Sequence, residues 1–302
     1  MYLRRLVTVL RKAGSAWVDD RAQSMGAALS YYTVFSIAPL LLIAISVAGL
    51  VFGRDAAQGA VVDQLQGLIG ESGAQAIQDL LKNVSKPSQG IIATITGVVV
   101  LVIGATSVFA ELQDDLNRIW EAPTPRKVST WWAWLRTRLL SMGMIFAIGF
   151  LMLVSLAASA AFDAFASWST SALAGWEPLA HAVNFIVSFV LTTVLFAMIY
   201  RFMPQATIEW RDVGIGALVT AFLFAIGKFL IGLYIGKSAL ASGFGAAGSL
   251  AVLLAWVYYS AQIFLFGAEF TWAYAHAFGS HQDKAADALP ADVAGRPAVH
   301  LR

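Results

Sequence analysis

A lysine inside a long apolar run is the residue of this sequence with the clearest chemical potential. Lys228 is the only charged residue of the stretch 213–235. A charged side chain near the middle of a bilayer costs about 3 kcal/mol, so it marks a functional site by default. Two interpretations stay open. Lys228 either extends to the outer headgroups, or faces an internal cavity and binds an anionic group, with Asp163, Glu177 and His181 as candidate partners at that level.

Hydroxyl and amide side chains interrupt two other apolar runs, at the beginning of 27–52 and near the end of 245–270. They are Tyr31, Tyr32 and Ser36 in the first run, and Tyr258, Tyr259 and Gln262 in the last. With Lys228 they could line a substrate pathway. Hydrogen bonds between helices, worth about 1 kcal/mol each, would explain the same residues. Pro39, Gly227 and Gly232 lie within apolar runs and are predicted to let the helices bend.

Ionisable residues also lie where apolar runs end. Glu111 and Glu269 both fall at predicted cytoplasmic ends, as do Arg201 and Arg21. Depth along the helices therefore predicts that Glu269 pairs with these arginines rather than with Lys228. A structural ion cluster and a cytoplasmic gate both remain open for this set, and Asp163 at the opposite level is a further candidate.

The sequence argues against catalysis, cofactors and nucleic acid. It contains neither HExxH, GxSxG nor a phosphate-binding loop, and its acidic and histidine residues are not spaced for a metal. With no cysteine and four histidines, thiolate chemistry is excluded and little remains for metal chemistry. The net charge of +2 is too small to predict nucleic-acid binding. We therefore expect that the protein is not an enzyme, has no catalytic residue, and binds no cofactor or metal.

Composition and apolar runs predict an all-α polytopic membrane bundle. Hydrophobic residues make up 59% of the 302 residues and charged residues only 13%, about half the usual fraction of a soluble domain. About 20 apolar residues span a bilayer as a helix. Six such spans are predicted, at about 27–52, 91–110, 139–162, 182–200, 213–235 and 245–270.

Three polar segments complete the predicted organisation around the membrane domain 27–278. Residues 1–26 are predicted to be a basic amphipathic arm, 53–89 an extracytoplasmic loop of two short amphipathic helices, and 279–302 a disordered tail. The lysines and arginines number 15 on the side of the two termini and 4 on the other. By the positive-inside rule, both termini are predicted to be cytoplasmic.

Five stretches of this sequence resemble the YihY/BrkB family of bacterial inner-membrane proteins. They are AALSYYTVFSIAPLLL (27–42), GATSVFAELQDDLNRIWEAP (104–123), YRFMP (200–204), GALVTAFLFAIGKFLIGLY (216–234) and GSLAVLLAWVYYSAQIFLFGAEF (248–270). The resemblance implies six spans in the cytoplasmic membrane. It also implies structural or transport importance for Tyr31, Tyr32, Pro39, Asn117, Trp120, Arg201, Pro204, Lys228, Tyr234, Trp256 and Glu269.

The resemblance implies less about activity. Some members have carried the name ribonuclease BN, but nothing in these residues supports nuclease chemistry. Others are linked to serum resistance and envelope lipid export. We therefore predict a transporter or flippase-like permease for an amphipathic or anionic substrate, such as a lipid. The alternative is a non-transporting envelope scaffold or assembly partner. Membrane lipids are the expected partners, and a homo-oligomer or an envelope protein partner remains open.

Overall fold

The computed structural model is helical wherever it describes the chain. It describes residues 2–53, parts of 55–81, 91–122, the single positions 139, 143 and 149, 177–237, and 248–281. Its long helices are α1 (Tyr2–Asp19), α2 (Ala22–Phe52), α4 (Ile91–Ile119), α6 (Glu177–Phe202), α7 (Trp210–Lys237) and α9 (Gly248–Ala277). No strand occurs within these described residues, which confirms the all-α class.

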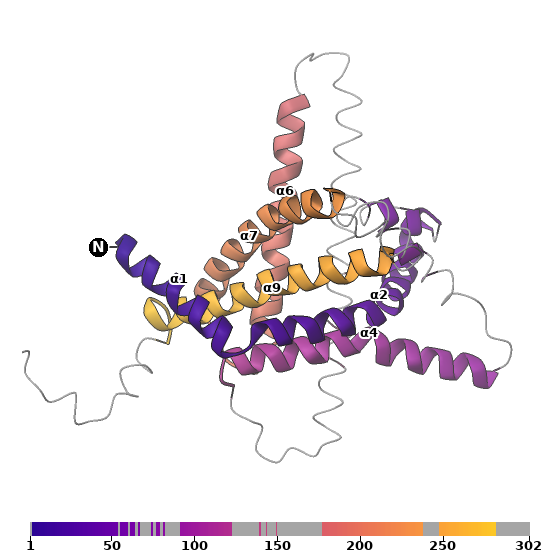
Figure 1. The fold of residues 1–302 in the computed structure, drawn as a ribbon. Coiled ribbons are helices and arrows are strands. Elements are labelled where there is room, and N and C mark those ends of the chain that lie inside the picture. The colour runs from indigo at the N-terminus through magenta and orange to yellow at the C-terminus, as the bar shows by residue number, and fades with distance from the viewer. Residues whose placement is uncertain are drawn as a thin grey trace, which may run out of the picture.

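The helices pack as a layered bundle around α9 (Figure 1). α4 packs on α2, α2 on α9, α9 on α7, and α7 on α6, while α1 lies against α9. The largest core cluster lies between these helices and includes Leu29, Leu116, Tyr200 and Leu265. α9 is therefore the helix around which the described bundle is organised.

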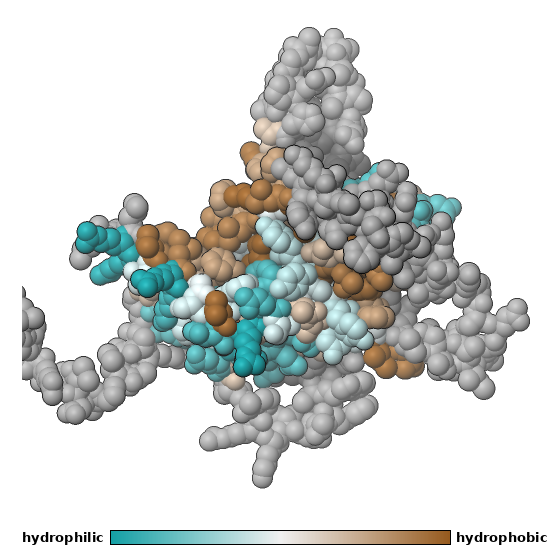
Figure 2. Space-filling model, in the orientation of Figure 1, coloured by the Kyte–Doolittle hydropathy of each residue, from teal (hydrophilic) through white to brown (hydrophobic). Residues whose placement is uncertain are grey.

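Four helices have the length and apolar composition needed to cross a membrane. These segments are Ala22–Ser46, Phe185–Phe202, Trp210–Ile231 and Leu250–Ala277. They correspond to four of the six predicted spans, while 91–110 lies within α4 and 139–162 falls almost entirely outside the described residues. Figure 2 shows hydrophobic residues covering the visible side of α7, a mixture of hydrophilic and hydrophobic residues along α1, and hydrophilic residues at the α1–α2 turn. The total of six spans and the side of the termini stay predictions.

Two helices run past the ends of the spans predicted for them. α9 continues to Ala277, seven residues past the predicted end of the last span. α4 continues past residue 110 and ends at Ile119, before Pro123 and Pro125. Glu121 has a left-handed φ of 47°, and the Ala122 amide donates to the Asn117 carbonyl at 2.8 Å. A hydrogen-bonded C-terminal turn, rather than a proline, therefore ends this helix.

The N-terminal arm is a helix docked on α9. Val9 and Ala13 are buried and share a core cluster with Phe270 and Ala273. Arg21, with a left-handed φ of 57°, turns the chain between α1 and α2, and α2 already begins at Ala22. The predicted arm 1–26 therefore ends too late, because its last five residues belong to the long helix α2.

Part of the predicted external loop is folded against the bundle. Val61, Ile77 and Leu81 are buried in one cluster with Leu41 and Ile45 of α2, and with Leu253 and Val257 of α9. The loop residues at helical spacing therefore have an apolar partner surface at the end of α2 and the beginning of α9.

α7 and α9 cross through two matched glycine–threonine pairs. A side chain at Gly216 would collide with Thr271, and one at Gly267 would collide with Thr220. Each threonine donates its hydroxyl to the carbonyl of the glycine four residues before it, Thr220 to Gly216 at 2.8 Å and Thr271 to Gly267 at 2.7 Å. Small residues let helix backbones approach closely in membranes.

Candidate functional site

The turn between α6 and α7 is held by polar side chains of α4. Gln113 donates its Nε2 to the Met203 carbonyl at 2.9 Å, and Asn117 Oδ1 accepts the Gln205 amide at 2.7 Å. Gln113 and Asn117 are one helical turn apart, so both lie on one face of α4. Backbone groups that leave a helix need new partners. These two side chains supply them where α6 ends.

Asp212 fixes the chain beyond α9 to the beginning of α7. Its side chain is 1% exposed, and its Oδ2 accepts the Ser280 amide at 2.9 Å and the Ser280 hydroxyl at 2.8 Å. A side chain at Gly279 would collide with this carboxylate. The predicted disordered tail 279–302 therefore begins too early, because residues 279–281 are tied to the bundle.

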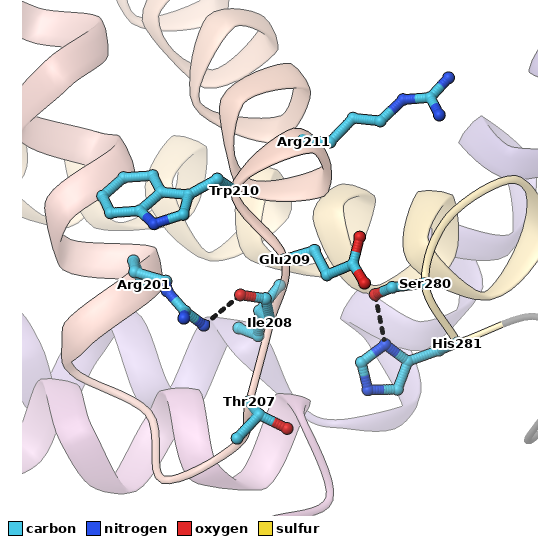
Figure 3. Close-up of a pocket in the computed structure, with 8 residues that line it drawn as sticks. All are labelled: Arg201, Thr207, Ile208, Glu209, Trp210, Arg211, Ser280 and His281. Atoms are coloured by element: carbon cyan, nitrogen blue, oxygen red, sulfur yellow. Dashed lines mark hydrogen bonds between the residues drawn. The ribbon is translucent and has the colours of Figure 1, made fainter.

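A groove of about 540 Å³ opens between these two turns (Figure 3). Its lining residues are Arg201, Thr207, Ile208, Glu209, Trp210, Arg211, Ser280 and His281. Arg201 donates to the Ile208 carbonyl, so its guanidinium bridges the end of α6 and the residues before α7. In Figure 3, Glu209 points towards Ser280, while Arg211 points away from the other lining residues. The groove thus has one arginine within it and a second at its edge.

Aromatic side chains form the exposed edge of this groove. Trp210 is 56% exposed, and its ring lies edge-to-face with the half-exposed Phe202 at 5.8 Å between centroids. The guanidinium carbon of Arg201 lies 5.8 Å from the centroid of Trp210. Tryptophan favours the membrane–water interface, and arginine binds phosphate and carboxylate groups. The groove is suited to the polar head of an anionic amphipathic molecule.

The predicted pathway residues do not converge. Lys228 is exposed, and Tyr31 is 59% exposed with its ring packed against Tyr32 and Phe35. Tyr32, Tyr258 and Tyr259 are each 37% exposed. Most of the predicted polar stripe therefore lies on outer faces of the described bundle.

Two members of the predicted stripe do face inward. Ser36 is buried, and its Oγ has no hydrogen-bond partner among the described residues. Gln262 donates Nε2 to the Ala22 carbonyl at 3.3 Å, while its Oε1 is buried without a partner in the same part of the chain. A side chain at Gly26 would collide with Gln262, so α2 approaches α9 closely here.

The residues predicted to bend helices lie inside continuous helices. α2 runs through Pro39, and α7 runs through Gly227 and Gly232. A side chain at Gly227 would collide with Ile263 and press against Tyr259. α7 therefore packs closely on α9 at Gly227, independently of any bend, and a larger residue there would displace the end of Ile263.

Glu269 forms no ion pair with Arg201 or Arg21 in the part of the chain that the structure describes. Glu269 is 1% exposed, its Oε1 is buried without a hydrogen-bond partner among the described residues, and the charged groups nearest to it are the acids Asp20 and Asp19. Arg201 instead binds the Ile208 carbonyl, and Arg21 is exposed at the α1–α2 turn. Glu269, Arg201 and Arg21 were predicted to lie at the same depth in the membrane. Depth does not determine the direction in which each side chain points. Asp163 lies outside the described residues.

Glu111 belongs to an acidic stretch near the end of α4, which is predicted to lie on the cytoplasmic side. It lies beyond the predicted span 91–110, with Asp114 and Asp115 in the following turn. Burial, reinforced by the charges of Glu111 and Asp114 and opposed by Arg118, raises the pKa of Asp115 to about 7. Asp115 Oδ2 is buried without a hydrogen-bond partner from any segment that the structure describes. This carboxyl is therefore a group that titrates near neutral pH.

Asp212 and Gln113 were missed from the sequence. The signals were present, because Asp212 lies in the first turn of α7 and Gln113 precedes Asn117 by four residues. Neither signal indicates the partner residue, because Ser280 lies 68 residues from Asp212 and Met203 lies 90 residues from Gln113. Among the residues that the structure describes, no group of three acidic or histidine side chains is arranged to hold a metal.

Comparison with known proteins identifies the family. A family model described as virulence factor BrkB matches residues 13–291. This chain belongs to the BrkB family. The two motif stretches that contain Asn117 and Arg201 are thus family segments that dock on each other at the α6–α7 turn.

Relatives of the chain are named membrane proteins. A UPF0761 membrane protein of Alcanivorax borkumensis is 30% identical over 83% of this chain and 56% of the relative. Those of Pseudomonas paraeruginosa and Ralstonia nicotianae are 28% and 27% identical, over 83% and 86% of this chain and 59% and 56% of the relatives. The chain thus spans less than two thirds of their length. No solved structure matches it. It is a membrane protein with several apolar helices.

Proposed function

We propose that this BrkB-family protein is a permease or flippase-like transporter that moves an anionic amphipathic substrate, such as a lipid, across the bacterial inner membrane. The groove between the α6–α7 turn and residues 280–281 is the observation that carries the proposal. It combines the cations Arg201 and Arg211 with the exposed ring of Trp210. Basic pockets between membrane helices bind anionic lipid headgroups. The proposed activity forms no covalent bond and needs no catalytic residue or cofactor.

The groove belongs on the cytoplasmic side in the proposed topology, in which six spans place both termini there. The chain has no cysteine, so single-cysteine variants report the side directly. Arg118→Cys and Asp55→Cys place a thiol at exposed positions predicted to lie inside and outside. In intact cells, a membrane-impermeant maleimide should label only the Asp55→Cys variant. The reverse pattern would overturn the topology.

A flux assay tests the proposed transport. Purified protein in liposomes that contain a fluorescent anionic phospholipid should speed the movement of that lipid between leaflets. Arg211→Gln and Trp210→Ala should slow it several-fold, because they remove a cation and the aromatic edge of the groove. Arg118→Gln, which removes an exposed arginine outside the groove, is the matched control. Equal flux in protein-containing and protein-free liposomes would contradict transport of this lipid class.

The pathway proposed from the sequence is tested in the same liposomes. Lys228→Ala should slow the flux and Lys228→Arg should retain most of it if the cation contacts the substrate. Glu269→Gln tests whether the buried carboxyl takes part. Unchanged flux in all three variants would remove these residues from the transport route.

A second candidate function is an envelope scaffold. The observation that favours it is the folded part of the loop, in which Val61, Ile77 and Leu81 are buried against α2 and α9. A loop held in place presents exposed groups such as Asp55 and Asp63 to an envelope partner or a second copy. Charge reversal at these two positions should abolish the cross-linking of this loop to that partner in cells while lipid flux persists. Unchanged cross-linking would exclude this surface.

A further inference from the structure

α1 has two apolar faces, and the bundle covers only one of them. Val9 and Ala13 are buried in one cluster with residues of α9. Large apolar side chains on a second face remain between 40% and 59% exposed, and at 3.6 residues per turn they fall on one side of the helix, next to the docked residues. We call this second face the open face of α1, and its residues are Leu6, Val7, Leu10 and Val18.

Exposed arginines border the open face. Arg4 and Arg11 lie two helical turns apart, so both line the edge of this face on the side away from α9. The other two cations of α1 lie beyond the docked residues, where Lys12 is placed over the Trp272 ring at 4.6 Å and Arg5 is exposed. An apolar face with cations along its edge matches an anionic phospholipid surface, in which phosphates lie directly above acyl chains.

The place of α1 in the bundle puts the open face at the level where a membrane helix leaves the lipid. α1 lies at one end of the bundle, at an angle to α2 and α9 (Figure 1). It contacts α9 around Phe270 and Ala273, where the last predicted span ends. Trp272 and Tyr274 pack in the same cluster, and aromatic residues of this type are enriched at membrane–water interfaces. A helix that crosses α9 here lies at the depth of the lipid headgroups.

We propose that the open face of α1 binds the surface of the bilayer, with its four apolar side chains among the lipid headgroups and with Arg4 and Arg11 against the phosphates of anionic phospholipid. One helix then joins the bundle to the membrane surface, because its docked face contacts α9 and its open face contacts lipid. Binding of this kind strengthens as the share of anionic lipid rises, since charge attraction adds to the burial of apolar area. The proposal is independent of transport, because it needs neither a moving substrate nor the groove.

Spin labels on this cysteine-free chain test the contact in liposomes. Leu10→Cys and Val18→Cys place a label on the open face, and Ser15→Cys, at an exposed polar position of the same helix, is the matched control. Oxygen concentrates in lipid, whereas a nickel chelate stays in water. With phosphatidylglycerol in the liposomes, the ratio of oxygen to nickel collisions should be several-fold higher for the two open-face labels than for the control. Equal ratios at residues 10 and 15 would overturn the proposal.

Lipid charge and arginine substitution test the recognition of anionic lipid. In liposomes of phosphatidylcholine alone, the collision ratio of the Leu10→Cys label should fall several-fold. Arg11→Gln should lower it in phosphatidylglycerol, whereas Arg5→Gln removes an equal charge away from the open face and should leave it unchanged. A ratio that responds to neither lipid charge nor Arg11→Gln would overturn this recognition. Protection of the label from both reagents would show that protein, such as a second copy of this chain, covers the open face, and would also overturn the proposal.

Discussion

The helix-end cluster and the predicted pathway use polar residues in opposite ways. The cluster consists of Gln113, Asn117, Asp212 and Ser280 at helix ends and of the buried pair Tyr200 and Thr220, and it joins α4, α6, α7 and the chain after α9. Tyr200 is fully buried, donates to the Phe264 carbonyl at 2.7 Å and bonds the Thr220 hydroxyl at 3.1 Å. By contrast, Lys228, Tyr31 and Tyr258 are exposed.

The difference follows from where backbone amide and carbonyl groups lack hydrogen-bond partners. Inside a helix the amides and carbonyls are bonded within their own segment, so they do not require side chains as partners, although the buried Tyr200 hydroxyl also donates to the Phe264 carbonyl within α9. At a helix end these groups are free, and polar side chains of neighbouring helices turn inward to meet them. The cluster is therefore expected to carry stability, whereas the pathway residues are free to act on a substrate. Four predictions test this division.

The largest effect is expected at the α7–α9 crossing. Gly267→Ala places a methyl group against Thr220 and Tyr200, and overpacking of this kind costs about 1–3 kcal/mol. The matched control is Gly214→Ala, where no described atom lies within 4 Å of the added carbon. It should be neutral or stabilise α7 by up to about 1 kcal/mol. Thermal unfolding in detergent measures both. Equal melting temperatures for the two variants would mean that the crossing is not tightly packed.

A pH-dependent effect is expected at Asp115. The pKa of this buried acid rises from 3.8 to about 7, so the folded state binds more protons than the unfolded state between these values. Stability should therefore fall as the pH rises from about 4 to about 7, and stay at the lower level above that. Asp115→Asn should reduce this decline, to which the raised pKa values of Glu111 and Asp114 also contribute, and should raise the melting temperature at pH 8. Melting curves measured across this range decide it, and a parallel decline in the variant would exclude Asp115 as its source.

A smaller loss of stability is expected from Tyr200→Phe. It removes a buried hydroxyl that serves both Thr220 and the Phe264 carbonyl, and a hydrogen bond contributes about 1 kcal/mol. Tyr31→Phe is the matched control, because Tyr31 is exposed and its replacement should leave unfolding unchanged. Denaturant unfolding compares the two. The contrast between the regions fails if Tyr31→Phe proves as harmful as Tyr200→Phe.

The smallest change in stability is expected at Lys228. Lys228→Gln alters an exposed position, where substitutions usually change stability by less than about 0.5 kcal/mol. Its melting temperature should match wild type even if its lipid flux falls. A large drop in melting temperature would place Lys228 among the structural residues rather than on a pathway.

Sequence reasoning succeeded for features with a local cause. Apolar length predicted the helices of α2, α6, α7 and α9. It failed for Glu269, because a position along a helix gives depth but not the partner across the interface. It also assigned the exposed residues Tyr31 and Lys228 to the pathway, because the polarity of a residue in a span does not determine the direction of its side chain.

The sequence by itself determined that this is an all-helical membrane protein with the motifs of its family, because bilayer thickness and hydrophobicity act on each segment separately. Only the tertiary structure decided that Asp212 binds Ser280, that Gln113 binds the turn after α6, and that Glu269 is buried. These contacts join residues far apart in the chain. Their geometry depends on how the helices pack, which no single segment encodes.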